Sequence, residues 1–397
     1  MELELLAPAG DMEKLKTAIY FGADAVYLGG PFMHLRTTPT DFTMESLKTA
    51  VEYSHSAEKK VYVTVNAFAR NGDFGALPEY LVELERMGVD GIIVSDIGVI
   101  DLAVRTAPDL AVHVSTQASC VNYAAANVYY RMGARRVVLG RELSLDEIRE
   151  LRDKTPPELE LEAFVHGAMC MAYSGRCLIS AVLAGRDSNR GDCAQPCRWH
   201  YKLVQTERSD EELPVLEDEN GTAIMSSRDL KTIEFIDEIA RAGVCSFKIE
   251  GRMKSPYYVA TVTNAYRKAL DHSAPLEQLE RELLSASHRE FSTGFYFGKI
   301  KHEPPAPDGY IQGAMFAAVV LSADGEKLLI EQRNRFFAGD TLEVLSPDSS
   351  GLSVCVSEMW DEDGNAVQSA PHPKQRLYIR SPLMLHEGDI LRKRIAD

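Results

Sequence analysis

The strongest constraint on the fold is a repeated alternation between short β-branched apolar runs and segments of helical periodicity, which continues to about residue 272. Eight runs have the length and composition of buried strands: Glu4–Leu6, Ala25–Leu28, Lys60–Asn66, Gly91–Ser95, Ala111–Thr116, Arg136–Leu139, Leu159–His166 and Val244–Glu250. The helical segments between or after them include Met12–Phe21, Met44–Ser56, Leu77–Met87, Asn122–Met132, Leu145–Arg152, Leu230–Ala242 and Ser255–Asp271. Such alternation requires a parallel sheet covered by helices, and eight repeats favour a closed, TIM-like (β/α)8 barrel over an open sheet.

Two departures from this repeat define the domain organisation. The stretch of about 168–225 follows the seventh strand and is too long for an ordinary βα loop, so we expect a functional cysteine-rich insertion there. After residue 290 the sequence changes to a proline-rich stretch and then to strand-like runs separated by turns. We therefore predict a barrel domain over residues 1–290, a linker over 291–308 and a small β-barrel domain over 309–397.

Composition narrows the class of protein. The net charge of −16 argues against a generally basic surface that coats nucleic acid, although local basic patches are compatible with it. The first residues carry acid where a signal peptide needs base, and no apolar run approaches the roughly 18 residues that cross a bilayer. Seven cysteines are too few and odd in number for a disulfide scaffold. We expect a soluble cytoplasmic protein that does not bind membranes, and the sequence leaves its oligomeric state open.

Four of the seven cysteines are clustered in the predicted insertion. They follow the pattern Cys170-x6-Cys177-x15-Cys193-x3-Cys197. Structural zinc sites usually have closely spaced cysteine pairs at both ends, and here only the last pair is close. The wide first spacing suits loops wrapped around a larger inorganic core, so we favour an iron–sulfur cluster. Zinc is the first alternative, and free thiols or a redox disulfide are the second.

Polar residues at the ends of the predicted strands are the other candidates for chemistry, because barrel active sites lie at the C-terminal ends of the strands. The candidate catalytic residues are His113, Gln117, His166, Glu250 and Arg252. The candidate substrate-binding residues are Asn66, Arg141, Lys248 and Lys254. Amides suit a polar substrate, and arginines can bind carboxylate or phosphate in a bidentate manner.

Each of these residues also has a structural interpretation, because barrel interiors and surfaces hold satisfied polar groups and salt bridges. Several basic residues interleaved with the cysteines can offset a thiolate-ligated cluster, attract an anion, or simply be solvated: Arg176, Arg186, Arg190, Arg198 and His200.

Several motifs resemble those of the peptidase U32, or collagenase-like, family. The motifs are Leu6-Ala-Pro-Ala-Gly-Asp11, Gly22-Ala-Asp-Ala-Val-Tyr-Leu-Gly-Gly30, His113-Val-Ser-Thr-Gln117, Glu162-Ala-Phe-Val-His-Gly-Ala-Met-Cys170, Ser174-Gly-Arg-Cys-Leu-Ile-Ser180, Gly191-Asp-Cys-Ala-Gln-Pro-Cys-Arg198 and Phe247-Lys-Ile-Glu-Gly-Arg-Met-Lys-Ser-Pro-Tyr-Tyr258. The segment from Arg335-Phe-Phe-Ala-Gly-Asp340 onward looks like the small translation-factor-like barrel of that family. The resemblance covers most of the chain.

The resemblance implies a function and a set of ligands. Members were named as proteases, while others act in hydroxylation of tRNA wobble uridine, ribosomal RNA cytidine or ubiquinone precursors, and several carry a four-cysteine [4Fe–4S] cluster. The full length looks most like the tRNA uridine branch, which implies tRNA as partner and prephenate as a small carboxylate co-substrate. Some relatives place a ligand cysteine after an Asp-Leu pair, where this chain has Asp229-Leu-Lys231. Cys197 is then the expected fourth ligand, ahead of Cys245 and Cys120.

We therefore predict an iron–sulfur-dependent enzyme that hydroxylates C5 of a tRNA wobble uridine. A U32-type peptidase with cysteine or metal chemistry is the first alternative, although no His-Glu-x-x-His or Gly-x-Ser-x-Gly motif is present. A non-enzymatic iron–sulfur protein that binds RNA is the second.

Overall fold

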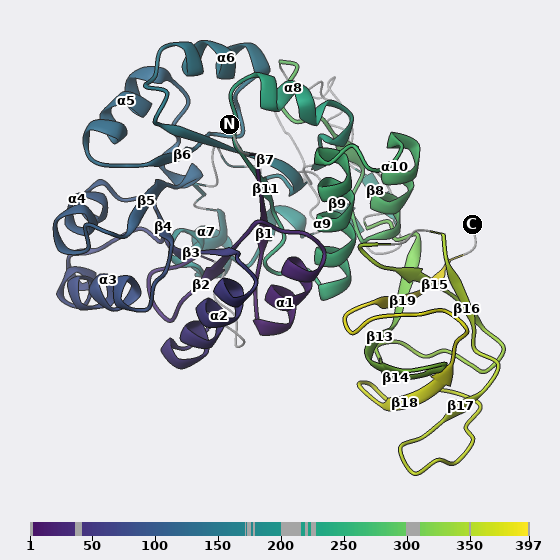
Figure 1. Cartoon of the computed structure of the whole chain (residues 1–397). Coiled ribbons are helices and arrows are strands. Elements are labelled where there is room, and N and C mark those ends of the chain that lie inside the picture. The colour runs from purple at the N-terminus through teal and green to yellow at the C-terminus, as the bar shows by residue number, and fades with distance from the viewer. Residues whose placement is uncertain are drawn as a thin grey trace. The chain divides into compact units, whose positions relative to one another are not determined.

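A computed structural model of the chain describes residues 3–35, 42–170, 172, 176–177, 179–199, 216–218, 221–223, 228–298, 310–348 and 351–395. The remaining parts of the predicted insertion and linker, together with Ser174 and His200, lie outside the described residues. The chain forms two compact units (Figure 1). The first contains residues 1–19, 23–254 and 289–309, and the second contains residues 20–22, 255–288 and 310–397.

The first unit is a closed parallel barrel, as predicted. Its eight strands are β1 (Glu4–Pro8), β2 (Ala25–Gly29), β3 (Lys60–Val65), β4 (Gly91–Val94), β5 (Ala111–Val114), β6 (Arg136–Val138), β7 (Glu160–Ala168) and β11 (Ser246–Ile249). Each strand pairs in parallel with the next, and β11 closes the ring by pairing with both β7 and β1. All eight predicted strand runs are therefore confirmed, because each is a short apolar segment buried on both faces.

Helices lie outside the ring of strands in this unit (Figure 1). They are α1 (Met12–Tyr20), α2 (Met44–Ser56), α3 (Leu77–Arg86), α4 (Ile97–Thr106), α5 (Tyr123–Arg131), α6 (Leu145–Asp153) and α8 (Ile236–Arg241). Helix α4 was not among the predicted segments, although its buried residues Val99, Ile100 and Ala103 have helical spacing. Asp96 precedes it and accepts hydrogen bonds from Gly98 N and Val99 N, so this strand-end carboxylate is a helix N-cap.

The predicted helix over Leu230–Ala242 is wrong at its start. Residues Asp229–Lys231 form a strand, β10, which pairs antiparallel with the end of β7 and parallel with β12 (Phe291–Ser292). The fully buried Asp229 carboxylate accepts hydrogen bonds from the Arg289 guanidinium at 2.7 and 3.0 Å. This tertiary ion pair holds the segment extended, and a one-turn 3-10 helix, η6 (Ile233–Phe235), comes before α8.

A buried polar network crosses the barrel interior. Arg136 donates to Glu4 Oε1 at 2.6 Å and to Glu162 Oε2 at 3.1 Å, and Ser246 Oγ donates to the same two carboxylates. Lys248 Nζ lies 2.7 Å from the other Glu162 oxygen. Buried charges are tolerated only when they are paired, and here each carboxylate contacts at least one cation. The network therefore fixes Glu162 and, through it, Lys248.

The second unit is built on an antiparallel sheet that forms a half-barrel. Its strands are β13 (Ala314–Asp324), β14 (Lys327–Gln332), β15 (Thr341–Leu345), β16 (Ser353–Cys355), β17 (Met359–Trp360), β18 (Arg376–Arg380) and β19 (Ile390–Arg394), in the spatial order β16-β15-β19-β13-β14-β18-β17. Alternate side chains such as Leu328, Ile330, Leu377 and Ile379 are fully buried and form its core. This confirms the predicted small β domain.

Two helices group with this sheet, whereas the sequence assigned them to the barrel domain. They are α9 (Pro256–Leu270) and α10 (Leu276–Ser285). Tyr257 stacks on Phe316 at a ring distance of 5.6 Å, and Arg392 donates to the Glu282 carboxylate at 2.6 and 2.8 Å. These contacts, rather than chain order, decide the grouping. No helix in the described residues of either unit is both long and apolar enough to cross a membrane.

Candidate active site at the barrel mouth

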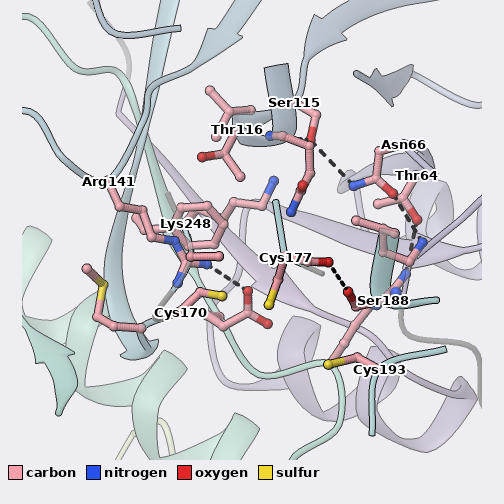
Figure 2. Close-up of a pocket in the computed structure, with 18 of the residues that line it drawn as sticks. Thr64, Asn66, Ser115, Thr116, Arg141, Cys170, Cys177, Ser188, Cys193 and Lys248 are labelled. Carbon is pink, nitrogen blue, oxygen red and sulfur yellow. Dashed lines mark hydrogen bonds and ion pairs between the residues drawn. The ribbon is translucent and has the colours of Figure 1, made fainter. Parts of the chain in front are cut away.

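One cavity of about 160 Å³ lies at the C-terminal ends of the barrel strands, where barrel enzymes bind their substrates. Strand ends supply one part of its lining: Tyr27, Thr64, Asn66, Ser115, Thr116, Gln117, Arg141, Glu142, Phe164, Lys248, Glu250 and Arg252. The cysteine-rich insertion supplies another, which includes all four predicted ligands, Cys170, Cys177, Cys193 and Cys197. Figure 2 shows Cys170, Cys177 and Cys193 along one side of the cavity, across from Ser115 and Thr116.

Lys248 reaches the cavity from β11 and is almost fully buried. Besides its ion pair with Glu162, its ammonium lies 4.4 Å from the centre of the Tyr27 ring and 5.5 Å from that of Phe164. An ammonium over aromatic faces is attracted by the ring quadrupole. The lysine is therefore held in one position by three neighbours.

Arg141 follows β6 and is fixed on three sides. Its guanidinium lies 3.8 Å from the centre of the Phe164 ring, donates to Ala168 O at 2.6 Å and to Glu250 Oε2 at 2.9 Å. Figure 2 shows Arg141 at the side of the cavity, near Lys248. The predicted site residues Arg141 and Glu250 are thus partners of one another, and their position depends on the insertion through Ala168.

Arg252 follows β11 and lies against β2 and β3. Its Nη1 donates to Thr64 Oγ1 at 3.0 Å, and the residue is only 7% exposed. A Cβ atom at Gly29 would lie 2.8 Å from the same Nη1, which is closer than a carbon can approach. Gly29 is therefore required for Arg252 to occupy this place, and this explains one glycine of the Leu-Gly-Gly motif.

Uncharged hydrogen-bonding groups line another part of the cavity. Asn66 Nδ2 donates to Ser115 Oγ at 3.4 Å, and Asn66 Oδ1 accepts from Leu35 N at 3.3 Å. Gln117 lies in the short 3-10 helix η2 (Thr116–Ala118), where Ser115 caps its backbone N–H. Asn66 and Gln117 both line the cavity.

The cysteines are held by a local hydrogen-bond network. The Asn189 side chain accepts from Cys177 N at 3.2 Å and donates to Cys177 O at 2.9 Å, while Ser188 Oγ donates to the same carbonyl at 2.7 Å. Ile179 N lies 3.4 Å from Cys177 Sγ. The buried Ser180 hydroxyl accepts from Ala194 N at 3.0 Å, next to Cys193. These bonds connect the segments that carry the second and third cysteines.

The insertion is fastened to the loop after β3, which contains the 3-10 helix η1 (Asn71–Gly75). The backbone of Phe68 donates to Asn189 O at 2.9 Å, and Arg190 binds both carboxylate oxygens of Asp73 at 2.8 and 3.1 Å. The side-chain hydrogen bond from Arg190, followed by the backbone hydrogen bond from Arg70, lowers the pKa of Asp73 below its ordinary value. Two segments far apart in sequence thus form one wall of the site.

The basic residues of the insertion mainly contact the protein. Arg176 donates to Gln117 O at 2.8 Å, Arg186 pairs with Asp192 at 2.6 Å, and Arg190 pairs with Asp73. The Arg198 side chain and His200 lie outside the described residues. For the three described arginines, the role is to hold the insertion together and to the barrel.

Three predicted site residues do not line the cavity. His113 is 1% exposed inside the barrel, packed edge-on against Tyr62, and burial followed by the charges of Arg136 and Lys248 holds its pKa well below the ordinary value. His166 is buried beside Phe291 where β7 meets β10. Lys254 ends a turn whose backbone N–H bonds to Gly251 O. Period-two alternation alone does not say at which height in the barrel a strand residue lies.

Sequence reasoning did not identify Thr64, Asp73 or Asn189 as parts of the site, and it named Gly29 and Ser180 only within longer motifs, without a role. Each acts on a partner distant in sequence, such as Gly29 on Arg252 and Asp73 on Arg190. Only Gly29 had a signal, because a Gly-Gly pair at a strand end indicates close approach by another group.

The four thiols share one cavity without converging on a point. Among the described residues, no three His, Cys, Asp or Glu side chains lie together closely enough to hold a single metal ion. All four cysteines are free of disulfides. Four thiols therefore line the cavity, and no histidine is among the described residues that line it.

Comparison with known proteins gives matches over both units. Residues 10–304 match the model of peptidase family U32, and residues 312–392 match the model of the peptidase family U32 C-terminal domain. A Bacillus subtilis protein named tRNA hydroxylation protein P1 is 40% identical over 98% of this chain and 94% of its own length. Its Escherichia coli counterpart, tRNA hydroxylation protein P, is 34% identical over 96% of this chain and 94% of its own length.

A third similar protein acts on a different RNA, according to its name. It is the Escherichia coli 23S rRNA 5-hydroxycytidine C2501 synthase, which is 36% identical over 68% of this chain and 39% of its own length. The three relatives thus have RNA hydroxylation in common.

Proposed function

The chain belongs to peptidase family U32, and we propose from this premise that it is an enzyme that hydroxylates tRNA, at C5 of a wobble uridine. The single observation that carries the proposal is the cavity, in which four cysteines and three cations from the barrel face one another. We infer the type of reaction from the names of the relatives of nearly equal length, and the cavity contains side chains that suit this reaction.

Cationic side chains at the cavity can bind a small anionic co-substrate. Arg141, Lys248 and Arg252 line it, although Arg141 is paired with Glu250 and Lys248 with the buried Glu162, and Glu142 also lines the cavity. Cations held in a partly enclosed site bind carboxylates strongly, because little solvent screens them there. Prephenate, a dicarboxylate, fits this requirement, and we propose it as the oxygen donor.

The cysteines suit an iron–sulfur cluster better than one zinc ion. All four cysteines line one cavity, and only the Cys193–Cys197 pair has the close spacing that is usual at both ends of a structural zinc site. Cys170, Cys177, Cys193 and Cys197 would hold the cluster, which when bound supplies one-electron or Lewis-acid chemistry. The Ile179 N–H, 3.4 Å from Cys177 Sγ, would donate a hydrogen bond to this ligand.

The remaining residues would orient the substrates. Replacement of the C5 hydrogen of uridine by a hydroxyl group from the donor is a two-electron oxidation of the base, so a separate electron acceptor must take up these two electrons, and the oxygen donor and the base must be held together. Asn66 and Gln117 can hydrogen-bond an extruded base. Arg252, supported by Thr64, and Lys248, supported by Glu162, can hold the carboxylates of the donor.

The test compares tRNA nucleosides by mass spectrometry in a deletion strain. We expect 5-hydroxyuridine and its derivatives to be absent, to return with the wild-type gene, and to stay absent with Cys193→Ala or Arg252→Gln. In a strain blocked in prephenate synthesis they should also be absent until prephenate is supplied. Unchanged nucleosides in the deletion strain would refute the function, and unchanged nucleosides in the blocked strain would refute prephenate alone.

The cluster has its own measurement. Protein purified without oxygen should contain about four iron and four sulfide per chain, and Cys193→Ala should lose most of both. One zinc per chain in place of iron would contradict the cluster.

The family name offers peptidase as a second function, and the geometry does not favour it. A cysteine peptidase needs a thiol within hydrogen-bonding distance of a general base, usually histidine. His113 and His166 lie inside the barrel wall, away from the described lining of the cavity that holds the thiols. We therefore expect no peptide hydrolysis by the purified protein.

A further inference from the structure

The second unit contains two segments without a single acidic residue, in a chain of net charge −16. The segments are Gln332–Gly339 and Asn365–Arg380. Together they carry five cations: Arg333, Arg335, Lys374, Arg376 and Arg380. Such a local excess of positive charge is unexpected for a protein whose acids outnumber its bases, 59 to 43.

The fold places the two segments side by side. Gln332 exchanges backbone hydrogen bonds with the Lys374–Gln375 turn at 2.9 and 3.0 Å, and farther along Ala338 N donates to Gln368 O and Ala370 N donates to Phe336 O, each at 3.0 Å. Phe337 and Ser369 form an antiparallel bridge. The cations therefore belong to one continuous edge of the half-barrel, which we call the basic edge and define as residues 332–339 and 365–380.

Three cations of the basic edge have no carboxylate partner. Arg335, Lys374 and Arg376 are exposed, and within the part of the chain that the structure describes no carboxylate lies within ion-pair distance of them. Arg333 pairs with Glu331 at 2.8 Å, and Arg380 pairs with Glu358 at 3.3 Å. The edge thus presents three uncompensated positive charges to solvent.

An exposed aromatic ring accompanies these charges. Phe337 is 45% exposed, and the Arg335 guanidinium lies 5.1 Å from its ring centre. Lys374 adopts a left-handed backbone conformation, φ 59°, that glycine or asparagine adopts more easily. The turn therefore places a lysine at the edge despite a conformational cost.

We propose that the basic edge is an RNA-binding surface, which holds the phosphate backbone through Arg335, Lys374 and Arg376 and stacks a base on Phe337. The choice of RNA as partner rests on the proposed function. Cations combined with an exposed aromatic face are how proteins bind single-stranded and looped RNA, whereas a purely cationic patch would suit any polyanion. The barrel cavity would then act on the base, and the second unit would add affinity for the tRNA.

The experiment measures tRNA binding by the full chain over a range of salt concentrations. The triple variant Arg335→Gln, Lys374→Gln, Arg376→Gln should bind unmodified tRNA roughly 10-fold or more weakly near 0.1 M salt, with a salt slope reduced by about two units, because fewer counterions are released. Phe337→Ala should weaken binding roughly fivefold, and Phe337→Tyr should restore it.

A matched control removes the same total charge elsewhere. Three exposed cations serve for this: Arg105 on α4, Arg149 on α6 and Lys154 at the C-terminal end of α6. Each pairs with a carboxylate three or four residues earlier in the chain. Their triple glutamine variant should change the tRNA dissociation constant less than twofold. Equal losses in both triple variants, or an unchanged affinity in the basic-edge variant, would overturn the proposal.

Two readouts separate this inference from the proposed function. Fluorescence of Trp360 verifies that the second unit of each variant is folded, since Trp360 lies in β17. If the wild-type protein binds tRNA through the basic edge but the tRNA nucleosides are unchanged in the deletion strain, the proposed hydroxylation is refuted and the proposed RNA-binding surface is supported. If the tRNA is hydroxylated and the basic-edge triple variant binds tRNA with wild-type affinity, only the proposed RNA-binding surface is refuted.

Discussion

Single residues at the cavity act mainly by making room for, or fixing, a neighbour that is distant in sequence. Gly29 is the clearest case, since a methyl group there would lie 2.6 Å from the His34 ring and 2.8 Å from Arg252 Nη1. Its backbone lies in β2, so the requirement for glycine is steric and does not come from an unusual dihedral angle.

We predict that Gly29→Ala displaces the Arg252 guanidinium and lowers kcat/KM for tRNA hydroxylation by about 10- to 100-fold, as small misplacements of positioning groups do. Single-turnover kinetics with prephenate as variable substrate provide the measurement. Gly75→Ala is the control, because a Cβ atom there meets nothing within 4 Å. Wild-type kinetics in Gly29→Ala would show that Arg252 does not act on the substrate.

At the scale of elements, the insertion carries the predicted ligands and also the residues that hold one of them, Cys177, in position. Its 3-10 helix η4 (Ser188–Arg190) contacts Cys177 through Ser188 and Asn189 and contacts the loop after β3 through Arg190. One short element thus connects a predicted ligand to the barrel. Asn189 is 9% exposed, and its amide satisfies both the N–H and the C=O of Cys177.

Asn189→Leu should therefore loosen the position of Cys177 and raise the rate at which the protein loses iron to a chelator. Substitution of a residue that supports a metal ligand typically lowers the metal affinity by about 10- to 100-fold, and we expect an effect in this range. The assay is anaerobic and follows iron release by absorbance. Asn127→Leu is the control, since Asn127 lies on α5 outside the insertion and its amide donates to Lys154 O. Equal release rates for the two variants would contradict the role of Asn189.

At the scale of the whole molecule, each unit has its own buried ion pair, and each responds to acid. Burial alone would raise the pKa of Glu4 in the barrel, but the Arg136 guanidinium outweighs this effect and lowers that pKa below its ordinary value of 4.5. In the second unit, burial alone would raise the pKa of Glu282. The hydrogen bonds from Arg392 outweigh this effect, so the pKa of Glu282 is also lowered. A lowered folded-state pKa stabilises the folded state above pH 4.5 and loses this contribution as pH falls below it.

We predict that acid lowers the free energy of unfolding of both units. Glu4→Gln should make the first unit less sensitive to acid, and Glu282→Gln should do the same for the second. Trp199 and Trp360 are the only tryptophans and lie one in each unit, so Trp360→Phe and Trp199→Phe variants report the first and second unit separately. Urea unfolding between about pH 5 and 3 should show a shallower loss of stability in the first unit for Glu4→Gln and in the second for Glu282→Gln. An effect of Glu4→Gln on the Trp360 signal alone would contradict this assignment.

The sequence by itself determined the eight strands of the barrel, the small β domain and the group of four cysteines. Buried parallel strands and amphipathic helices leave local periodicities, and cysteines clustered within one insertion are visible without a structure. The same reasoning identified Asn66, Gln117, Arg141, Lys248, Glu250 and Arg252, because strand ends in a barrel converge on one face.

Only the tertiary structure decided which residues meet. His113 and His166 lie on barrel strands but away from the cavity lining, Leu230 is extended because Asp229 pairs with Arg289, and α9 belongs with the C-terminal sheet because Tyr257 packs on Phe316. The basic edge likewise exists only where two distant acid-free segments hydrogen-bond together. Periodicity records which face of an element is buried, whereas partners, heights and ion pairs depend on contacts between segments that the linear order does not encode.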